Sequence, residues 1–354
     1  MRSITLPSTF WPAALCIAIA VVGGFAFNFF QFPLAFMLGA IAFTMTAAIA
    51  GAPIARPNAR IVAPMRASLG VLLGSAVTPE LLDRIGALGA AAAFVPVFVV
   101  ISGAIGTVYY IKVARFSKEE AFFCAVPGGL HVMTIYAEEC GVDIRRVALA
   151  HALRITFVVL LMPFAVEYFL HVPTVNATAL TASIFSIAPK DLVLLFIAGF
   201  IGWYVGRKTG MPGGQMLGPL IASAALHIAG ITSAKPPVEI IVISQIIIGA
   251  SIGSRYIGET LEIVRTSVFY AFGHISITLT IAAMFAYVLH LVFDLPLITG
   301  ILSFAPGGMS ELGLIALGLG LDVGFVATIQ VSRLMTIAVF APWAFRHVRS
   351  FLKD

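Results

Sequence analysis

Two Pro-Gly-Gly segments place helix-breaking and polar residues inside apolar stretches of the chain. The first comprises Pro127, Gly128 and Gly129 and is followed by His131, and the second comprises Pro306, Gly307 and Gly308 and is followed by Ser310 and Glu311. Proline has no backbone N–H, and glycine leaves the backbone open to a partner. A helix that begins after such a break points its free N–H groups at the break, and this end favours an anion. We therefore predict that these residues bind a substrate, the alternative being a tight turn that only packs.

Glu311 is the strongest candidate for a functional role among these residues, because it is a carboxylate in an apolar stretch. A charge at the centre of a membrane costs about 3 kcal/mol on insertion scales unless it is paired or protonated. We expect Glu311 to couple to a proton or cation, or to bind a cationic substrate. The alternative is a cap on the helix that begins beside it.

Each break is followed by an aspartate and then an arginine: Asp143 and Arg154 after the first, Asp322 and Arg333 after the second. We expect each arginine to face a carboxylate from Glu311, an aspartate or a substrate. The alternative is an ion pair that locks the break to its helix. For the aspartates, a helix N-cap is favoured over a role in coupling or ion pairing.

The chain repeats itself at a shift of 179 residues. "PGGLHVMTIYAEECGVDIRRVALAHALR" and "PGGMSELGLIALGLGLDVGFVATIQVSR" share nine identities in 28 positions without a gap. Upstream, "FPLAFMLG" matches "MPGGQMLG" at the same shift, and "LLGSAV" resembles "IIGASI" if four residues are gapped. We predict two membrane repeats, residues 11–172 and 185–348, which form one integral membrane unit.

Residues 179 positions apart are called repeat mates below. The mate of Glu311 is Val132, so the two breaks are chemically unequal, and His131 is mated to Ser310. Two further polar mates, His151 and Gln330, are candidates to line a cavity or to bond between helices. Gln245 and Arg66 are weaker candidates.

Composition fixes the class of protein. Of 354 residues, 60% are hydrophobic and only 10% are charged, against about 25% charged in a soluble domain. We predict an all-α polytopic membrane protein whose first apolar run is retained as a helix. The basic residues are scattered, so we expect no nucleic acid as a partner. The cysteines and histidines lack the spacing typical of metal ligands, so we expect no metal site. We also expect no cofactor and no enzyme activity.

Loop charge decides between two topologies. If all twelve apolar segments cross, Lys and Arg divide 11 against 7 between the two sides. If both Pro-Gly-Gly segments dip in and return, the division is 15 against three, which the positive-inside rule prefers. We therefore predict ten spanning helices, two re-entrant hairpins and cytoplasmic termini. Each half then has five spans, so the halves are inverted and their tips meet near the midplane, a pattern of secondary transporters.

The doubled motif also resembles a known family. "FAPGGMSELGLIALGLGLDVGFVATIQVSRL", its earlier copy and "QIIIGASIG" are similar to the duplicated membrane AbrB family over nearly the whole chain. The resemblance implies an integral protein of the bacterial inner membrane. Members are often labelled regulators of gene expression or ammonia monooxygenases, but this sequence has neither a DNA-binding element nor a histidine cluster for copper.

The leading functional hypothesis is a secondary transporter or exporter of a small polar molecule, held between the hairpin tips and coupled through Glu311. The bilayer and that molecule are the expected partners, and a homo-oligomer is left open. A second hypothesis is a membrane-embedded sensor that affects gene expression indirectly. A third, a membrane monooxygenase, predicts bound copper.

Overall fold

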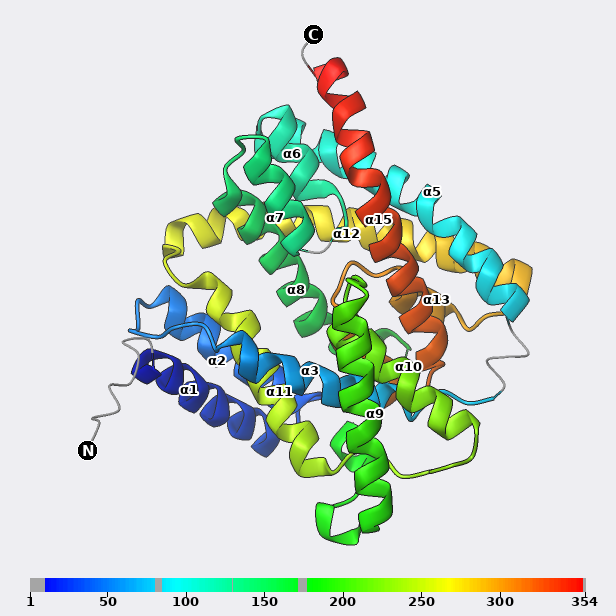
Figure 1. Ribbon diagram of the computed structural model, residues 1–354. Coiled ribbons are helices and arrows are strands. Elements are labelled where there is room, and N and C mark those ends of the chain that lie inside the picture. The colour runs from blue at the N-terminus through cyan, green and yellow to red at the C-terminus, as the bar shows by residue number, and fades with distance from the viewer. Residues whose placement is uncertain (1–9, 80–84, 129, 171–176, 353–354) are drawn as a thin grey trace.

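The computed structural model describes residues 10–79, 85–128, 130–170 and 177–352, and these residues form helices and no strand. Two groups of helices are visible in Figure 1. The helices α1, α2, α3, α9, α10 and α11 fill the lower part of the view, and α5, α6, α7, α8, α12 and α15 the upper part.

The helix bounds are as follows. The first half contains α1 (Phe10–Phe29), α2 (Ala35–Ile49), α3 (Ala59–Gly74), α5 (Ile85–Tyr109), η1 (Tyr110–Ala114), α6 (Lys118–Ala125), α7 (Leu130–Glu139) and α8 (Ile144–Leu170). The second contains η2 (Ala177–Leu180), η3 (Ile184–Ser186), α9 (Pro189–Lys208), α10 (Gly214–Ile228), α11 (Val238–Gly253), η4 (Ser254–Tyr256), α12 (Leu261–Phe293), α13 (Leu297–Phe304), α14 (Met309–Gly318) and α15 (Val323–Leu352).

Within these described ranges, seven helices are long and apolar enough to cross a membrane, and the predicted all-α polytopic class is confirmed. They comprise α1, α5 with η1, α8, α9, α11 with η4, α12 and the first part of α15. Three more predicted spans, α2, α3 and α10, have 15, 16 and 15 residues. At 1.5 Å per residue they reach about 22 to 24 Å, short of a core of about 30 Å. Ten spans therefore stay a prediction.

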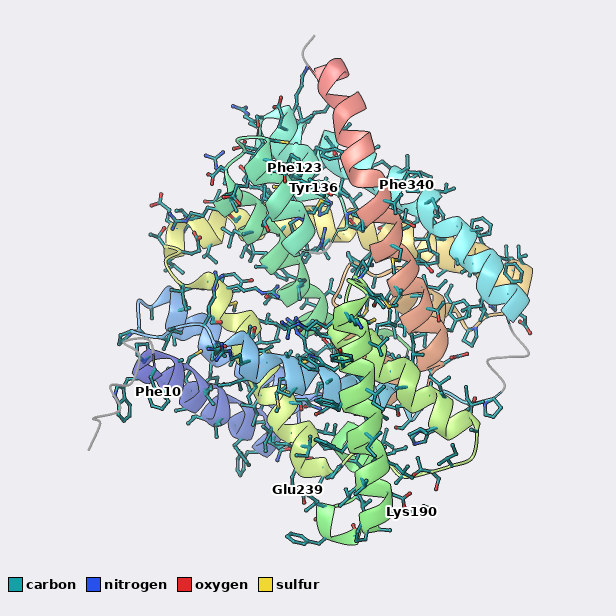
Figure 2. The ribbon with its side chains drawn as sticks, in the orientation of Figure 1. Phe10, Phe123, Tyr136, Lys190, Glu239 and Phe340 are labelled. Atoms are coloured by element: carbon teal, nitrogen blue, oxygen red, sulfur yellow. The ribbon has the colours of Figure 1, made fainter. Side chains whose placement is uncertain are left out.

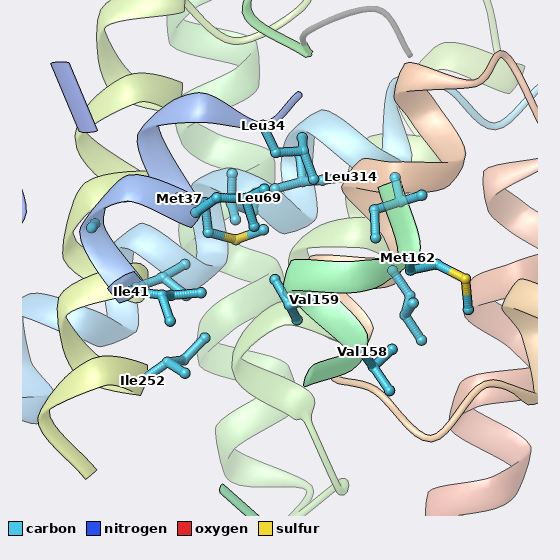
Figure 3. Close-up of a cluster of buried hydrophobic side chains, with 14 of the residues drawn as sticks. Leu34, Met37, Ile41, Leu69, Val158, Val159, Met162, Ile252 and Leu314 are labelled. Atoms are coloured by element: carbon cyan, nitrogen blue, oxygen red, sulfur yellow. The ribbon is translucent and has the colours of Figure 1, made fainter. Parts of the chain in front are cut away.

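Large apolar side chains remain exposed on several of these helices. Phe10 on α1 and Phe340 on α15 are 44% and 51% exposed (Figure 2). A bilayer favours such surfaces, because lipid tails are as apolar as the side chains. Inside, a buried cluster joins Met37 of α2, Leu69 of α3 and Val158 of α8 (Figure 3). The core thus links the lower group of helices to α8.

Both Pro-Gly-Gly segments interrupt helices, as predicted. The arms before the breaks, α6 and α13, have eight residues each, and the arms after them, α7 and α14, have ten. Such arms are about 12 to 15 Å long. Each is too short to cross a membrane alone.

The backbone of the second half follows the first at the predicted shift. Five helix pairs have both bounds 179 residues apart: α1 and α9, α2 and α10, α3 and α11, α6 and α13, α7 and α14. Positive φ angles recur in the same way, for example at Arg115 (56°) and Asp294 (52°). Because α3 and α11 pair without a gap, the predicted four-residue gap between "LLGSAV" and "IIGASI" is wrong. The repeat bounds 11–172 and 185–348 stay a prediction.

The halves are interwoven through helices that contact the other half. The α3 helix packs on α10, and α11 packs on α2. A methyl group at Gly70 of α3 would overlap the carbonyl oxygen of Met216, and one at Gly249 of α11 would crowd that of Met37. Where α3 meets α11, Ser244 Oγ lies 3.5 Å from Met65 Sδ, and these two residues are repeat mates. The lower group is therefore one body built from both halves.

Candidate functional site

The first break is held by Arg154, which projects from α8. Its Nη1 donates to the carbonyl oxygen of Val126 at 3.3 Å, and its Nη2 donates to that of Gly128 at 3.0 Å. These carbonyls follow the C-terminal end of α6, where backbone acceptors lack helical partners and a cation is favoured. Arg154 thus joins the break to the helix that follows it.

Arg333 of α15 holds the second break in the same way. Its Nη1 donates to the carbonyl oxygens of Ala305 at 2.6 Å and Phe304 at 3.4 Å. Its Nη2 donates to that of Gly307 at 3.0 Å. Ala305 and Gly307 are the repeat mates of the acceptors used by Arg154, so the clamp itself is duplicated.

The polar mates His151 and Gln330 support the two clamps. His151 Nε2 lies 2.8 Å from the carbonyl oxygen of Phe123, and its Nδ1 lies 2.8 Å from an Nη2 of the clamp arginine. Gln330 donates to the carbonyl oxygen of Leu302 at 3.0 Å and accepts from the second arginine at 2.8 Å. Since arginine can only donate, His151 carries its proton on Nε2. These side chains orient the arginines rather than face an open cavity.

The expected carboxylate partners of the arginines are not there. In the described part of the chain, Arg154 and Arg333 form no ion pair, and each is only 4% exposed. The prediction that each faces a carboxylate of the protein is therefore wrong. Backbone carbonyls freed by the breaks take that place, while the Nε of each arginine has no hydrogen-bond partner among the described residues.

Each tip packs against the last helix of the other half. A methyl group at Gly128 would lie 3.1 Å from Ile337 Cγ2, and one at Gly307 would lie 3.2 Å from Val158 Cγ1. Ile337 and Val158 are repeat mates, so the arrangement is reciprocal. Both tip prolines, Pro127 and Pro306, are buried, whereas Gly129 and the side chain of His131 lie outside the described residues.

Glu311 lies in the first turn of α14 and is 5% exposed. Its carboxylate rests against Gly308, where an added methyl group would overlap Oε2. Among the described residues, Glu311 Oε2 has no hydrogen-bond partner. Ser310 beside it is buried. The helix N-terminus favours the charge, but one carboxylate oxygen is left free.

The sequence analysis missed Arg255 as a candidate residue. Arg255 lies in η4, directly after α11, and is near enough to Glu311 and Arg66 to interact with them electrostatically. Its Nη1 is buried and has no hydrogen-bond partner in the part of the chain that the structure describes. The repeat could have revealed it, since "LGSAV" and "IGSRY" are mates and Arg255 replaces Ala76. The mistaken gap concealed this pairing, and the arginine was counted only as a loop charge.

The short η4 segment is fixed by neighbouring helices. Tyr256 donates its hydroxyl to Thr156 Oγ1 of α8 at 2.9 Å, and η4 packs on α2 and α8. The α14 helix in turn packs on α3 and α8. Both η4 and α14 therefore pack on α8, where the lower group of helices contacts the second tip.

The two predicted aspartates lie away from the tips. Asp143 accepts from the backbone N–H of Arg145 at 3.0 Å, and Asp322 accepts from that of Phe325 at 2.9 Å, as N-caps do. Asp143 lies 11 residues before Arg154, a distance of about 16 Å along a helix. It lines a separate pocket of about 580 Å³ together with Arg146. The aspartates thus begin the helices that carry the clamps.

Other parts of the described chain offer less chemistry. No three His, Cys, Asp or Glu side chains gather there to hold a metal ion. A larger groove of about 1090 Å³ runs between α3, α9 and the start of α11, and its walls are mainly apolar, with Arg60 and Arg207 among them. Its lining includes none of the predicted site residues.

An all-helical chain with several helices long enough to span a bilayer, and with two clamped breaks, defines a polytopic membrane protein. The chain belongs to the family whose model is described as "Transition state regulatory protein AbrB", which matches residues 36–349. The resemblance found in the sequence is therefore confirmed.

Two relatives illustrate the family. The "Uncharacterized protein YhjN" of Bacillus subtilis (strain 168) is 30% identical over 261 residues, which cover 68% of this chain and 67% of the relative. The "Putative regulator AbrB" of Escherichia coli (strain K12) is 23% identical over 339 residues, which cover 95% of this chain and 96% of the relative.

Proposed function

We propose that this protein is a secondary transporter or exporter of a small polar molecule, which binds between the two tips and undergoes no chemical change. The observation that carries this proposal is the duplicated clamp, in which Arg154 and Arg333 hold two helix breaks through matching carbonyls. Broken helices in paired positions, with free N–H ends directed at a shared site, are a recurrent design of secondary transporters.

The proposed topology has ten spans and two re-entrant hairpins, with both termini in the cytoplasm and the chain in the bacterial inner membrane. The division of loop charge supports it, as does the length of the hairpin arms, about 12 to 15 Å, which is half a hydrocarbon core. In this topology the halves are inverted. The first hairpin then opens to the cytoplasm and the second to the outside.

Unequal burial of the two hairpins supports alternation between two states. The segment Ser310–Gly318 of α14 is buried, and Gly313 packs against Leu73 of α3. On α7, Glu138 and Glu139 are exposed. In inverted repeats, exchanging the environments of the two halves moves access from one side to the other. Glu311, next to the second tip, couples this exchange to a proton or cation.

Metabolite profiling of cells tests the proposal. Cells that express the protein, Glu311→Gln or Gly307→Ala would be compared for uptake and export across a broad panel of small polar compounds. Gly89→Ala is the matched control, because nothing lies within 4 Å of an added methyl group there. We expect at least one compound to change with the wild-type protein and not with the two tip variants. Identical profiles for all four proteins, correctly inserted, would end the transport proposal.

A membrane-embedded sensor is the second candidate, favoured by the regulator-like names of the family and of the Escherichia coli relative. It requires a partner in the cytoplasm. Capture of one regulator with the full-length protein, together with no flux of any compound, would favour the sensor.

A further inference from the structure

The groove of about 1090 Å³ between α3, α9 and the start of α11 combines two positive charges with long apolar walls. Arg60, in the first turn of α3, and Arg207, in the last turn of α9, both line it. The other described lining residues are apolar or glycine, apart from Ser68, Gln215 and the amphipathic Trp203, and none of them is acidic. Such a groove suits an elongated molecule with an anionic end and an apolar tail.

The directions of the helices bring the two arginines to the same end of the groove. Close approaches pair α3 with α10 in ascending order and α9 with α10 in descending order: Gly70 meets Met216 and Gly74 meets Leu220, whereas Gly202 meets Gly218 and Gly206 meets Gly214. The α3 helix therefore runs in the same sense as α10, and α9 runs in the opposite sense. As a result, the start of α3 lies on the same side as the end of α9. Ile240 and Leu192 line the groove near the starts of α11 and α9.

The side chains of Arg60 and Arg207 are exposed and lack a partner of opposite charge. Within the described part of the chain, neither forms an ion pair or a side-chain hydrogen bond. Arg207 Cζ lies 5.6 Å from the centroid of the Trp203 ring, and Lys208 Nζ lies 6.0 Å from that of the Tyr204 ring. Trp, Tyr and basic side chains gather at the level of the lipid headgroups. The forked guanidinium groups are therefore free to bind a phosphate at that level.

The length and the walls of the groove match an acyl chain. Arg207 and Leu192 line it 15 positions apart on α9, a distance of about 22 Å. Half of a hydrocarbon core is about 15 Å thick, so the groove is long enough for the acyl chain of a lipid in one leaflet. Phe196 and Phe200, which line the groove between these two positions, are 73% and 56% exposed. An acyl chain is as apolar as these side chains and can cover them.

We propose that this groove binds one anionic phospholipid, whose phosphate contacts Arg60 and Arg207 and whose acyl chain lies along α9. In the proposed topology the two arginines face the cytoplasmic leaflet, whose negative surface attracts basic side chains. The lipid contacts α3 of the first half and α9 of the second, and so stabilises the lower group of helices. The site is independent of transport, because its described lining includes neither of the tips nor the clamp arginines.

Native mass spectrometry of the purified, delipidated full-length protein tests the lipid site. The probes are dioleoyl phosphatidylglycerol, which is anionic, and dioleoyl phosphatidylcholine, which is zwitterionic and has the same acyl chains. We expect the first phosphatidylglycerol to bind about tenfold or more tightly than phosphatidylcholine. Arg60→Gln combined with Arg207→Gln should remove this preference, because hydrogen bonds to a charged group are lost. Arg265→Gln, which removes an exposed arginine of α12 outside the groove, should keep the preference.

Melting temperatures in lipid nanodiscs separate loss of the site from loss of folding. In nanodiscs of phosphatidylcholine alone, the double variant and the wild-type protein should melt at comparable temperatures. Added phosphatidylglycerol should raise the melting temperature of the wild-type protein and of Arg265→Gln, but not that of the double variant, because a ligand stabilises the state that binds it. The proposal is overturned if the wild-type protein binds both lipids equally, or if the double variant keeps the preference for phosphatidylglycerol.

Ile240→Trp tests whether the tail of the lipid occupies the apolar part of the groove. It enlarges a half-buried lining residue at the start of α11 and leaves both arginines in place. We expect it to weaken phosphatidylglycerol binding several-fold, and unchanged binding would overturn the placement of the acyl chain.

Two further measurements distinguish the lipid from other occupants. The headgroup fragment sn-glycerol 3-phosphate should fail to displace phosphatidylglycerol at equal concentration, and displacement would assign the site to a free phosphate compound instead. In a chain without the three native cysteines, Phe196→Cys should form no disulfide-linked dimer in nanodiscs. An efficient dimer, formed without loss on addition of phosphatidylglycerol, would assign the groove to a second copy of the chain and overturn the proposal.

Discussion

Arg154 and Arg333 bind their own helix breaks in the same way: each Nη2 lies 3.0 Å from the carbonyl oxygen of the first glycine after the proline. Each arginine compensates carbonyls that the break removes from helical pairing. The clamp is therefore part of the fold, and the charges that distinguish the halves lie elsewhere.

Removal of one clamp should destabilise the protein. Arg333→Gln leaves the carbonyls of Ala305 and Gly307 without their charged donor, and each buried unsatisfied group costs about 1 to 3 kcal/mol. For these two carbonyls we expect a loss of roughly 2 to 6 kcal/mol, measured by thermal or denaturant unfolding in detergent. Arg265→Gln, at an exposed position of α12, serves as the control. Equal stability of the two variants would contradict a structural clamp.

Gly308 should be required because its missing side chain makes room for the carboxylate of Glu311. Gly308→Ala is expected to lower both stability and flux, and Gly89→Ala to lower neither. In a Glu311→Ala background the added methyl group meets no carboxylate, so its cost in stability should fall by about 1 kcal/mol or more. A double-mutant cycle on melting measures this coupling. Additive effects of the two substitutions would refute the steric explanation.

Cysteine accessibility should reveal opposite orientations of the two hairpins. In a background without Cys16, Cys124 and Cys140, the mates His131→Cys and Ser310→Cys are compared. We expect a membrane-impermeant maleimide to label the first from the cytoplasmic side only and the second from the outside only. Thr209→Cys, exposed after α9, marks the cytoplasmic side in the predicted topology. Labelling of both mates from one side would rule out inversion.

Asp322 should stabilise a helix and not couple transport. Asp322→Ala removes the acceptor for Phe325 N–H at the start of α15, and loss of an N-cap costs about 1 kcal/mol. We expect this loss in unfolding measurements with flux kept within about twofold, because the clamp on the same helix remains. Flux abolished at unchanged stability would instead assign Asp322 the coupling role considered from the sequence.

The sequence predicted the features that depend on residue type and spacing. The Pro-Gly-Gly breaks, the duplication and the arginines were visible because proline, glycine and charge are rare in apolar stretches. The partners of Arg154 and Arg333 were not predictable, since every residue has a carbonyl and backbone acceptors leave no trace in side-chain pattern. Arg255 was missed for another reason: a local gap in the alignment separated it from Ala76 and hid the new charge.

The contact between Met65 and Ser244 stays in place if the two halves exchange conformations. Because each residue is the mate of the other, an exchange of the two halves turns this contact into itself. Other contacts, such as that of Gly313 with Leu73, would be replaced by contacts between the repeat mates of the same residues. We therefore expect the two access states of the proposed cycle to have similar free energies. The crossing of α3 and α11 would stay in place while the two halves exchange conformations. Residues that differ between repeat mates, such as Glu311 and Val132, then decide which of the two states is favoured.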